Sequence, residues 1–198
     1  MTDTACPLLT ILDENDRDVD WSYSMRREMQ EIVPGLFLGP YAAAMKNKYE
    51  TLKKHGITHI VCIRQDVEAR FIRPNFLQHF VYLLLNIADK PTENIIQHFK
   101  KVKDFLDDCF RQGGRALVHG NAGISRSAAM VIAFIMERYS LSYRQASSHV
   151  QLRRFCINPN EGFVRQLMEF EPIYRARMSQ MNGQRSAEIG LLKRKYED

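Results

Sequence analysis

The segment from Ala116 to Tyr139 constrains the fold of this chain more than any other part of it. Ala116-Leu117-Val118 is a short apolar run, and the residues from Ser127 to Tyr139 are apolar on nearly every side of a helix. A helix that lacks a polar face must lie in the interior of a protein. A buried strand that leads through a loop into a buried helix is typical of an α/β sheet. The segment therefore predicts a central helix directly after a central strand.

The rest of the chain alternates between strand and helix patterns. Extended stretches are predicted on both sides of the Pro34-Gly35 turn, and runs rich in apolar and β-branched residues predict strands at 57–63 and 80–87. Such near-continuous apolar runs favour strands that are covered on both faces. Helices are predicted at 48–55, 93–112, 142–152 and 160–178, the second of them capped by Thr92. This order predicts an α/β fold in which helices cover both faces of a sheet.

The length of 198 residues suits one domain with tails. We predict an acidic, partly flexible arm at 1–27, one domain at 28–175 and a flexible polar tail at 176–198. The acidic residues of the arm are Asp13, Glu14, Asp16, Asp18 and Asp20. The tail carries Lys193-Arg194-Lys195, which resembles a minimal nuclear-import cluster but is too short to be specific.

The composition argues against several classes of site and location. Four cysteines (Cys6, Cys62, Cys109 and Cys156) form no Cys-x-x-Cys pair, so we expect free thiols in a reducing compartment and no metal site. No apolar run has the length of a secretory leader or a membrane span. The net charge of +5 either favours acidic partners such as phosphoproteins or only keeps the surface soluble. We expect a monomer without a cofactor, a nucleic-acid partner or a membrane.

The loop between the predicted central strand and helix has the properties of an anion site. The start of a helix presents unpaired N–H groups and the positive end of the helix dipole. Gly120 and Gly123 permit a close approach of the backbone to a ligand, and Arg126 can direct two hydrogen bonds to one phosphate. The loop lacks the lysine of a nucleotide-binding P-loop and the glycine spacing of a serine hydrolase or a dinucleotide site. A tetrahedral oxyanion is therefore the expected ligand.

His119-Gly120-x5-Arg126-Ser127 resembles the His-Cys-x5-Arg-Ser signature of protein tyrosine and dual-specificity phosphatases, with glycine at the cysteine position. Three other segments are similar to that family: the opening strands at 33–39, the general-acid loop at 86–89 and the closing segment at 158–167. The resemblance covers about residues 28–175. It implies the dual-specificity phosphatase fold, which has a central mixed, mostly parallel sheet flanked by helices.

The resemblance also implies roles for single residues. The family's cysteine attacks phosphorus as a thiolate, and Gly120 supplies no nucleophile in its place. Asp89 stands at the general-acid position, as a vestige or as an ordinary loop aspartate, and His119 is expected to be structural. The expected phosphate-binding residues are Gly120, Asn121, Ala122, Gly123, Ile124, Ser125 and Arg126. Because the thiolate charge is missing, we expect phosphate affinity to be retained or increased.

The predicted function is that of a catalytically inactive phosphatase, a pseudophosphatase, that binds phosphorylated proteins. Resemblance to inactive members of the family implies MAP kinases and an F-box ubiquitin-ligase adaptor as partners. It also implies a role as competitor, anchor or scaffold in kinase signalling and ubiquitin-ligase regulation, in the cytoplasm and the nucleus. Two alternatives stay open: a scaffold whose loop is an idle strand-to-helix turn, and a weak phosphatase that uses water or the hydroxyl of Ser125 or Ser127. Neither serine has an evident activating base in the sequence.

Two basic clusters are further candidates for binding surfaces. Arg153-Arg154 is expected either to flank the phosphate cleft or to be solvated. Arg64, Arg70 and Arg73 are expected either to form a second basic patch, suited to docking a kinase, or to be ordinary surface residues.

Overall fold

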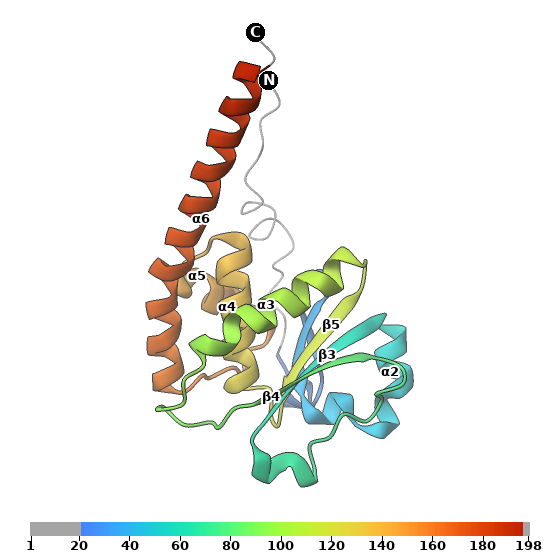
Figure 1. The fold of residues 1–198 in the computed structure, drawn as a ribbon. Coiled ribbons are helices and arrows are strands. Elements are labelled where there is room, and N and C mark those ends of the chain that lie inside the picture. Colours follow the sequence, from blue (N-terminus) through green and yellow to red (C-terminus); the bar gives the residue numbers. More distant parts are fainter. Residues whose placement is uncertain (1–20, 196–198) are drawn as a thin grey trace.

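A five-stranded sheet lies between one short helix on one face and four helices on the other (Figure 1). The structure is a computed structural model that describes residues 21–195, with side chains described for residues 21–180. The strands are β1 (Gln30–Val33), β2 (Leu36–Pro40), β3 (Ile57–Arg64), β4 (Val81–Asn86) and β5 (Arg115–Gly120). Their order across the sheet is β1-β2-β5-β3-β4, and only the β1–β2 pair is antiparallel. The predicted mixed, mostly parallel sheet is confirmed.

The helices divide unequally between the two faces of the sheet. Helix α2 (Tyr49–Lys54) covers one face, and the other face is covered by α3 (Ile96–Arg111), α4 (Arg126–Tyr139), α5 (Tyr143–Arg153) and α6 (Glu161–Lys195). Short 3-10 turns are present at Tyr23–Arg27, Tyr41–Ala44, Lys46–Lys48 and Asp66–Arg70. Helices on both faces, expected from the alternating pattern, are therefore confirmed.

Alternation along the strands builds two hydrophobic cores. Leu117 on β5 faces the smaller core beneath α2, while its neighbours Ala116 and Val118 face the larger core beneath the four helices. Every residue of α4 from Arg126 to Met136 is buried, as the sequence predicted for a helix without a polar face. The helix that follows the loop is thus fixed on all sides, and it holds the loop in one place.

Strand β4 is the first feature that differs from prediction. Its apolar run suggested cover on both faces, but β4 is an edge strand in which Val81 is 54% exposed and Leu84 is 42% exposed. Leu83 and Leu85 alternate with them and enter the larger core. An apolar run shows that a strand can be buried on both faces. The order of the strands in the sheet decides which strands are in fact buried on both faces.

Two helix boundaries also differ from prediction. Helix α3 begins at Ile96, and Thr92 does not cap it. The Gln166 side chain instead accepts a hydrogen bond from the Ile95 N–H at 2.7 Å and donates to the Glu93 carbonyl at 2.8 Å, so a contact from α6 sets this boundary. Helix α6 continues to Lys195 rather than ending at Met178. That segment is rich in residues of high helix propensity, such as Ala, Arg, Gln and Leu.

Other expectations concern the chain ends and the cysteines. Most of the acidic arm, with Cys6, lies outside the described residues, as do the side chains of Lys193-Arg194-Lys195. The division into arm, domain and tail stays a prediction. Cys62, Cys109 and Cys156 are free thiols. No helix within residues 21–195 is both long and apolar enough to span a membrane.

Candidate phosphate-binding site

The candidate site is the loop at residues 120–127, at the carboxyl end of β5, the strand between β2 and β3. Strand β5 ends at Gly120, and α4 begins at Arg126. Gly123 has φ +70°, and a Cβ atom there would lie 2.5 Å from the backbone of Gly39. Glycine is therefore required at 123 both by conformation and by the close approach of β2.

The carbonyl oxygens of residues 121–124 each accept a hydrogen bond from a group outside the loop. The Asn121 carbonyl accepts from the Tyr41 N–H at 3.0 Å, and the Ile124 carbonyl accepts from the Asn158 N–H at 2.9 Å. The carbonyls of Ala122 and Gly123 accept from Arg154 at 3.1 and 2.9 Å. Four consecutive peptide groups are thus anchored by their acceptor ends.

The donor ends of the same peptide groups have no protein partner. Within the described part of the chain, no N–H group of residues 121–125 donates a hydrogen bond to a protein acceptor. The loop and Asp89 line a cavity of about 270 Å³. A row of unpaired N–H groups at the start of a buried helix forms a cradle for an oxyanion.

Arg126 is buried and is oriented by two partners. Its Nη1 and Nη2 atoms donate to the two carboxylate oxygens of Glu68 at 2.5 and 2.9 Å, and Nη1 also donates to the Ile87 carbonyl at 3.1 Å. These bonds use three of the five N–H donors of the guanidinium. The Nε–H and one Nη2–H remain on a common edge, which is the geometry for a bidentate hydrogen bond to phosphate.

Glu68 is the partner of Arg126 that sequence reasoning missed. Burial raises the pKa of the Glu68 carboxyl, but hydrogen bonds from Arg126 and from the Gln65 N–H outweigh burial and hold that pKa below its usual value. Glu68 therefore stays ionised at neutral pH and holds Arg126 by charge as well as by geometry. Its spacing from Gln65 indicates a capping box, but nothing local in the sequence indicates a partner 58 residues away.

Asp89 forms one wall of the cavity. Its Oδ1 atom accepts hydrogen bonds from Ser125 Oγ at 2.7 Å and from Asn160 Nδ2 at 2.8 Å, and its Oδ2 atom lies 3.7 Å from Nε of Arg126. The sequence showed no base near Ser125, and the structure corrects this by placing Asp89 there. A carboxylate accepts the hydrogen bond of an alcohol but is a weak base toward its proton. The contact therefore orients the hydroxyl more than it activates it.

Position 120 has room for a larger side chain. A Cβ atom on Gly120 would lie 3.4 Å from Ser127 Oγ and 3.5 Å from the Ile63 carbonyl, both ordinary contact distances. The Ser127 hydroxyl is buried and has no hydrogen-bond partner among the described residues. An unpaired buried hydroxyl is costly, by about 1–3 kcal/mol. It faces the space in which a side chain at position 120 would begin.

His119 lies behind the loop and does not line the cavity, and the structural role expected for it stays a prediction. It is fully buried, its Nδ1–H points to the Gly120 carbonyl at 3.2 Å, and burial lowers its pKa to about 4. The imidazole is therefore neutral at neutral pH. It adds no charge to the cavity and makes no hydrogen bond to Ser125 or Ser127.

All the predicted phosphate-binding residues line the cavity, but two basic clusters lie elsewhere than expected. Arg154 does not flank the cavity, because it is fully buried and donates to Ala122, Gly123 and two carbonyls near β1. It supports the loop from behind, and burial lowers its pKa. Arg64 does not join Arg70 and Arg73 at the surface, since it donates to the Ile72 carbonyl.

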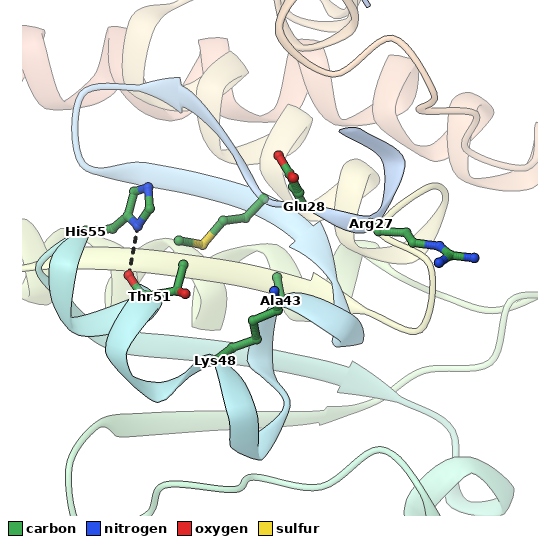
Figure 2. Close-up of a pocket in the computed structure, with 7 residues that line it drawn as sticks. Arg27, Glu28, Ala43, Lys48, Thr51 and His55 are labelled. Carbon is green, nitrogen blue, oxygen red and sulfur yellow. Dashed lines mark hydrogen bonds between the residues drawn. The ribbon is translucent and has the colours of Figure 1, made fainter. Parts of the chain in front are cut away.

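A second hollow lies away from this loop, beside α2 (Figure 2). It is lined by Arg27, Glu28, Met29, Ala43, Lys48, Thr51 and His55. Figure 2 shows that Arg27 and Glu28 point away from Lys48 and His55, and the His55 ring is bonded to the Thr51 carbonyl at 2.8 Å. Charged groups of both signs that diverge do not form an anion site, so the loop at 120–127 is the candidate.

Comparison with known proteins gives a consistent result. Residues 36–173 match the family described as dual specificity phosphatase, catalytic domain. Human serine/threonine/tyrosine-interacting protein is 59% identical over 189 residues, which cover 90% of this chain and 85% of that protein. Human dual specificity protein phosphatase 22 is 39% identical over 147 residues, or 74% of this chain and 76% of that protein. The crystal structure of human tyrosine phosphatase-like serine/threonine/tyrosine-interacting protein has a TM-score of 0.74 at 66% identity, covering 75% of this chain and 98% of that one.

Proposed function

This chain belongs to the dual-specificity phosphatase family, and we propose that it binds phosphorylated proteins without hydrolysing them. It is a relative of phosphatase-like interacting proteins. The observation that carries the proposal is a cavity lined by the loop and Arg126, in which residue 120 has no side chain that could act as a nucleophile. Among the described residues, the N–H groups of residues 121–125 and the Nε–Nη2 edge of Arg126 donate no hydrogen bond to the protein, although Asp89 Oδ2 lies 3.7 Å from Nε. Residue 120 is glycine.

The absence of a nucleophile has a large effect on hydrolysis. Uncatalysed hydrolysis of phosphate monoesters is among the slowest biological reactions, and enzymes accelerate it by up to ~10²¹-fold. Removal of the nucleophile from a serine protease lowers turnover by about 10⁶-fold. A comparable loss here leaves negligible turnover. Binding does not depend on the nucleophile, and without a thiolate the cavity carries one negative charge fewer against a phosphate dianion.

The partners and setting are proposed from the resemblance and from the relatives' name. Serine/threonine/tyrosine-interacting protein is, by its name, a protein that interacts. We extend this to phosphorylated proteins, MAP kinases among them, and to an F-box ubiquitin-ligase adaptor. In that role the chain acts as competitor, anchor or scaffold in the cytoplasm and the nucleus.

The proposal is tested by titrating a phosphotyrosine peptide and its unphosphorylated form against wild type and Arg126→Lys. Lysine preserves the charge facing Glu68 but removes the two-donor edge, so we expect a fold close to wild type and affinity reduced by about tenfold or more. Circular dichroism and thermal unfolding check the fold. Equal binding of both peptides, or no effect of Arg126→Lys in a folded protein, would mean that the loop is idle and that the outer surface does the binding.

A weak phosphatase is the second candidate, and the Ser125–Asp89 contact is the observation that favours it. In that case wild type would release phosphate from an aryl phosphate at a measurable rate. Ser125→Ala and Asp89→Asn would each abolish that release. We expect no release from wild type above that of heat-denatured protein.

A further inference from the structure

Another, open groove lies beside the phosphate loop. It has a volume of about 530 Å³ and is called the basic groove below. Its lining residues are Tyr41, Met45, Lys46, Asn47, Arg70, Phe71, Arg73 and Asn75. They come from two segments, the turns after β2 and the loop between β3 and β4.

Each of these segments is connected directly to the phosphate loop. On one side, the Tyr41 N–H donates to the Asn121 carbonyl at 3.0 Å, and the Tyr41 ring packs 5.9 Å from the His119 ring. On the other side, the turn Asp66–Arg70 sends Glu68 inward to Arg126 and exposes Arg70. The basic groove is therefore built on two segments that each contact the phosphate loop or its Arg126.

The basic groove is formed before any ligand binds. Asn75 Nδ2 donates to the Tyr41 hydroxyl at 3.1 Å and to the Ala44 carbonyl at 2.9 Å, which joins the two segments. Arg64 donates to the Ile72 carbonyl and fixes the β3–β4 loop from within. A groove whose walls are already connected loses little conformational entropy when a ligand binds.

The charge of the basic groove has one sign. Lys46, Arg70 and Arg73 are exposed, no acidic residue lines the groove, and none of the three cations forms an ion pair within residues 21–180. Two apolar side chains lie among them, since Phe71 is 54% exposed and Met45 is 44% exposed. Uncompensated cations beside exposed apolar groups fit an acidic peptide segment, whose carboxylates meet the cations while its backbone and apolar atoms cover the ring and thioether.

We propose that the basic groove binds an acidic segment next to the phosphorylated residue of the same partner protein. This inference rests on the proposed function, because the phosphorylated residue occupies the loop while its acidic flank occupies the groove. The cations come from both walls, so carboxylates spaced along a chain reach them better than a single group does. The partner class is thus a phosphoprotein with Asp or Glu flanking its phosphorylated residue.

Phosphopeptide titration by fluorescence anisotropy tests the proposal with two peptides, one with Asp-rich flanks and one with Asn in their place. The variant is Arg70→Gln/Arg73→Gln. The control is Lys54→Gln/Lys101→Gln, which removes the same charge at exposed positions outside the groove. We expect the variant to bind the Asp-flanked peptide about threefold to tenfold more weakly than wild type, because each exposed charge pair contributes on the order of twofold to fivefold. The Asn-flanked peptide is expected to bind variant, control and wild type alike.

The outcomes separate this inference from the proposed function. If wild type binds neither peptide, the proposed function is wrong and this inference falls with it. If wild type binds both peptides equally, or if the control weakens binding as much as the variant, the phosphate loop works but the groove assignment is wrong. If affinity increases only when a second phosphoserine replaces the acidic flank, the groove selects phosphate and the assignment to carboxylates is wrong.

Discussion

Asp89 provides the sharpest test of whether this cavity is built for binding or for catalysis. Its Oδ2 atom lies 3.7 Å from Nε of Arg126, on the edge that remains open to a phosphate. A phosphate oxygen that accepts from this Nε–H lies about 2.8 Å from it, which places the dianion roughly 5 Å from the carboxylate. Like charges at this distance repel. Asp89→Asn removes the charge, while the amide oxygen can still accept the bonds from Ser125 and Asn160.

The size of the effect follows from the distance and the exposure. A dianion and a unit charge about 5 Å apart interact by roughly 1.7 kcal/mol in water and by about 7 kcal/mol at an effective dielectric constant of 20. Asp89 is 35% exposed and also attracts Arg126, so the net gain in binding free energy on removing its charge lies near the lower end of this range. We expect Asp89→Asn to strengthen phosphopeptide binding by about 1–2 kcal/mol, or roughly fivefold to thirtyfold.

The assay is calorimetric titration of one phosphopeptide at neutral pH, at low and at high salt. The gain should shrink at high salt, because ions screen partly exposed charges. Asp104→Asn is the control, since this aspartate pairs with Lys100 on the surface of α3 and should leave affinity unchanged. Unchanged or weaker binding in Asp89→Asn, with the Ser125 contact intact, would refute the electrostatic argument.

Three further predictions concern single positions in the loop or directly before it. Gly120→Cys should acquire measurable aryl-phosphatase activity. Ser127→Ala in that background should reduce the activity, because the unpaired Ser127 hydroxyl faces the new side chain. An inert Gly120→Cys protein that still binds phosphopeptide would contradict this prediction. Gly123→Ala should lower the free energy of unfolding by about 2–4 kcal/mol in urea titrations, since alanine is strained at φ +70° and its Cβ atom would lie 2.5 Å from Gly39. A loss below about 1 kcal/mol would show that the loop can shift at little cost. Burial lowers the pKa of His119 from 6.5 to about 4, so below pH 6.5 the unfolded chain binds a proton that the folded protein does not. The contribution of His119 to the free energy of unfolding is therefore complete above pH 6.5 and falls by about 3 kcal/mol toward pH 4. His119→Asn should flatten the slope of the free energy of unfolding against pH in that range.

Local patterns in the sequence determined several elements of this protein. The apolar run from Ala128 to Met136 specified a buried helix, because no arrangement leaves such a helix a solvated face. Ser142 specified the start of α5, where its side chain accepts from the Gln145 N–H as in a capping box. The loop was readable as a candidate anion site because its glycines and Arg126 lie within a few residues of each other.

Only the tertiary structure decided which distant groups complete the site and which surfaces stay open. Glu68 meets Arg126 across 58 residues, and Arg154 reaches the loop from 31 residues away. Strand order placed β4 at an edge, and Gln166 set the start of α3. The 3.6-residue period of a helix and the two-residue period of a strand reflect how residues close together in the sequence share one face. Partners on different elements depend on the order in which strands join the sheet, and no local pattern records that order.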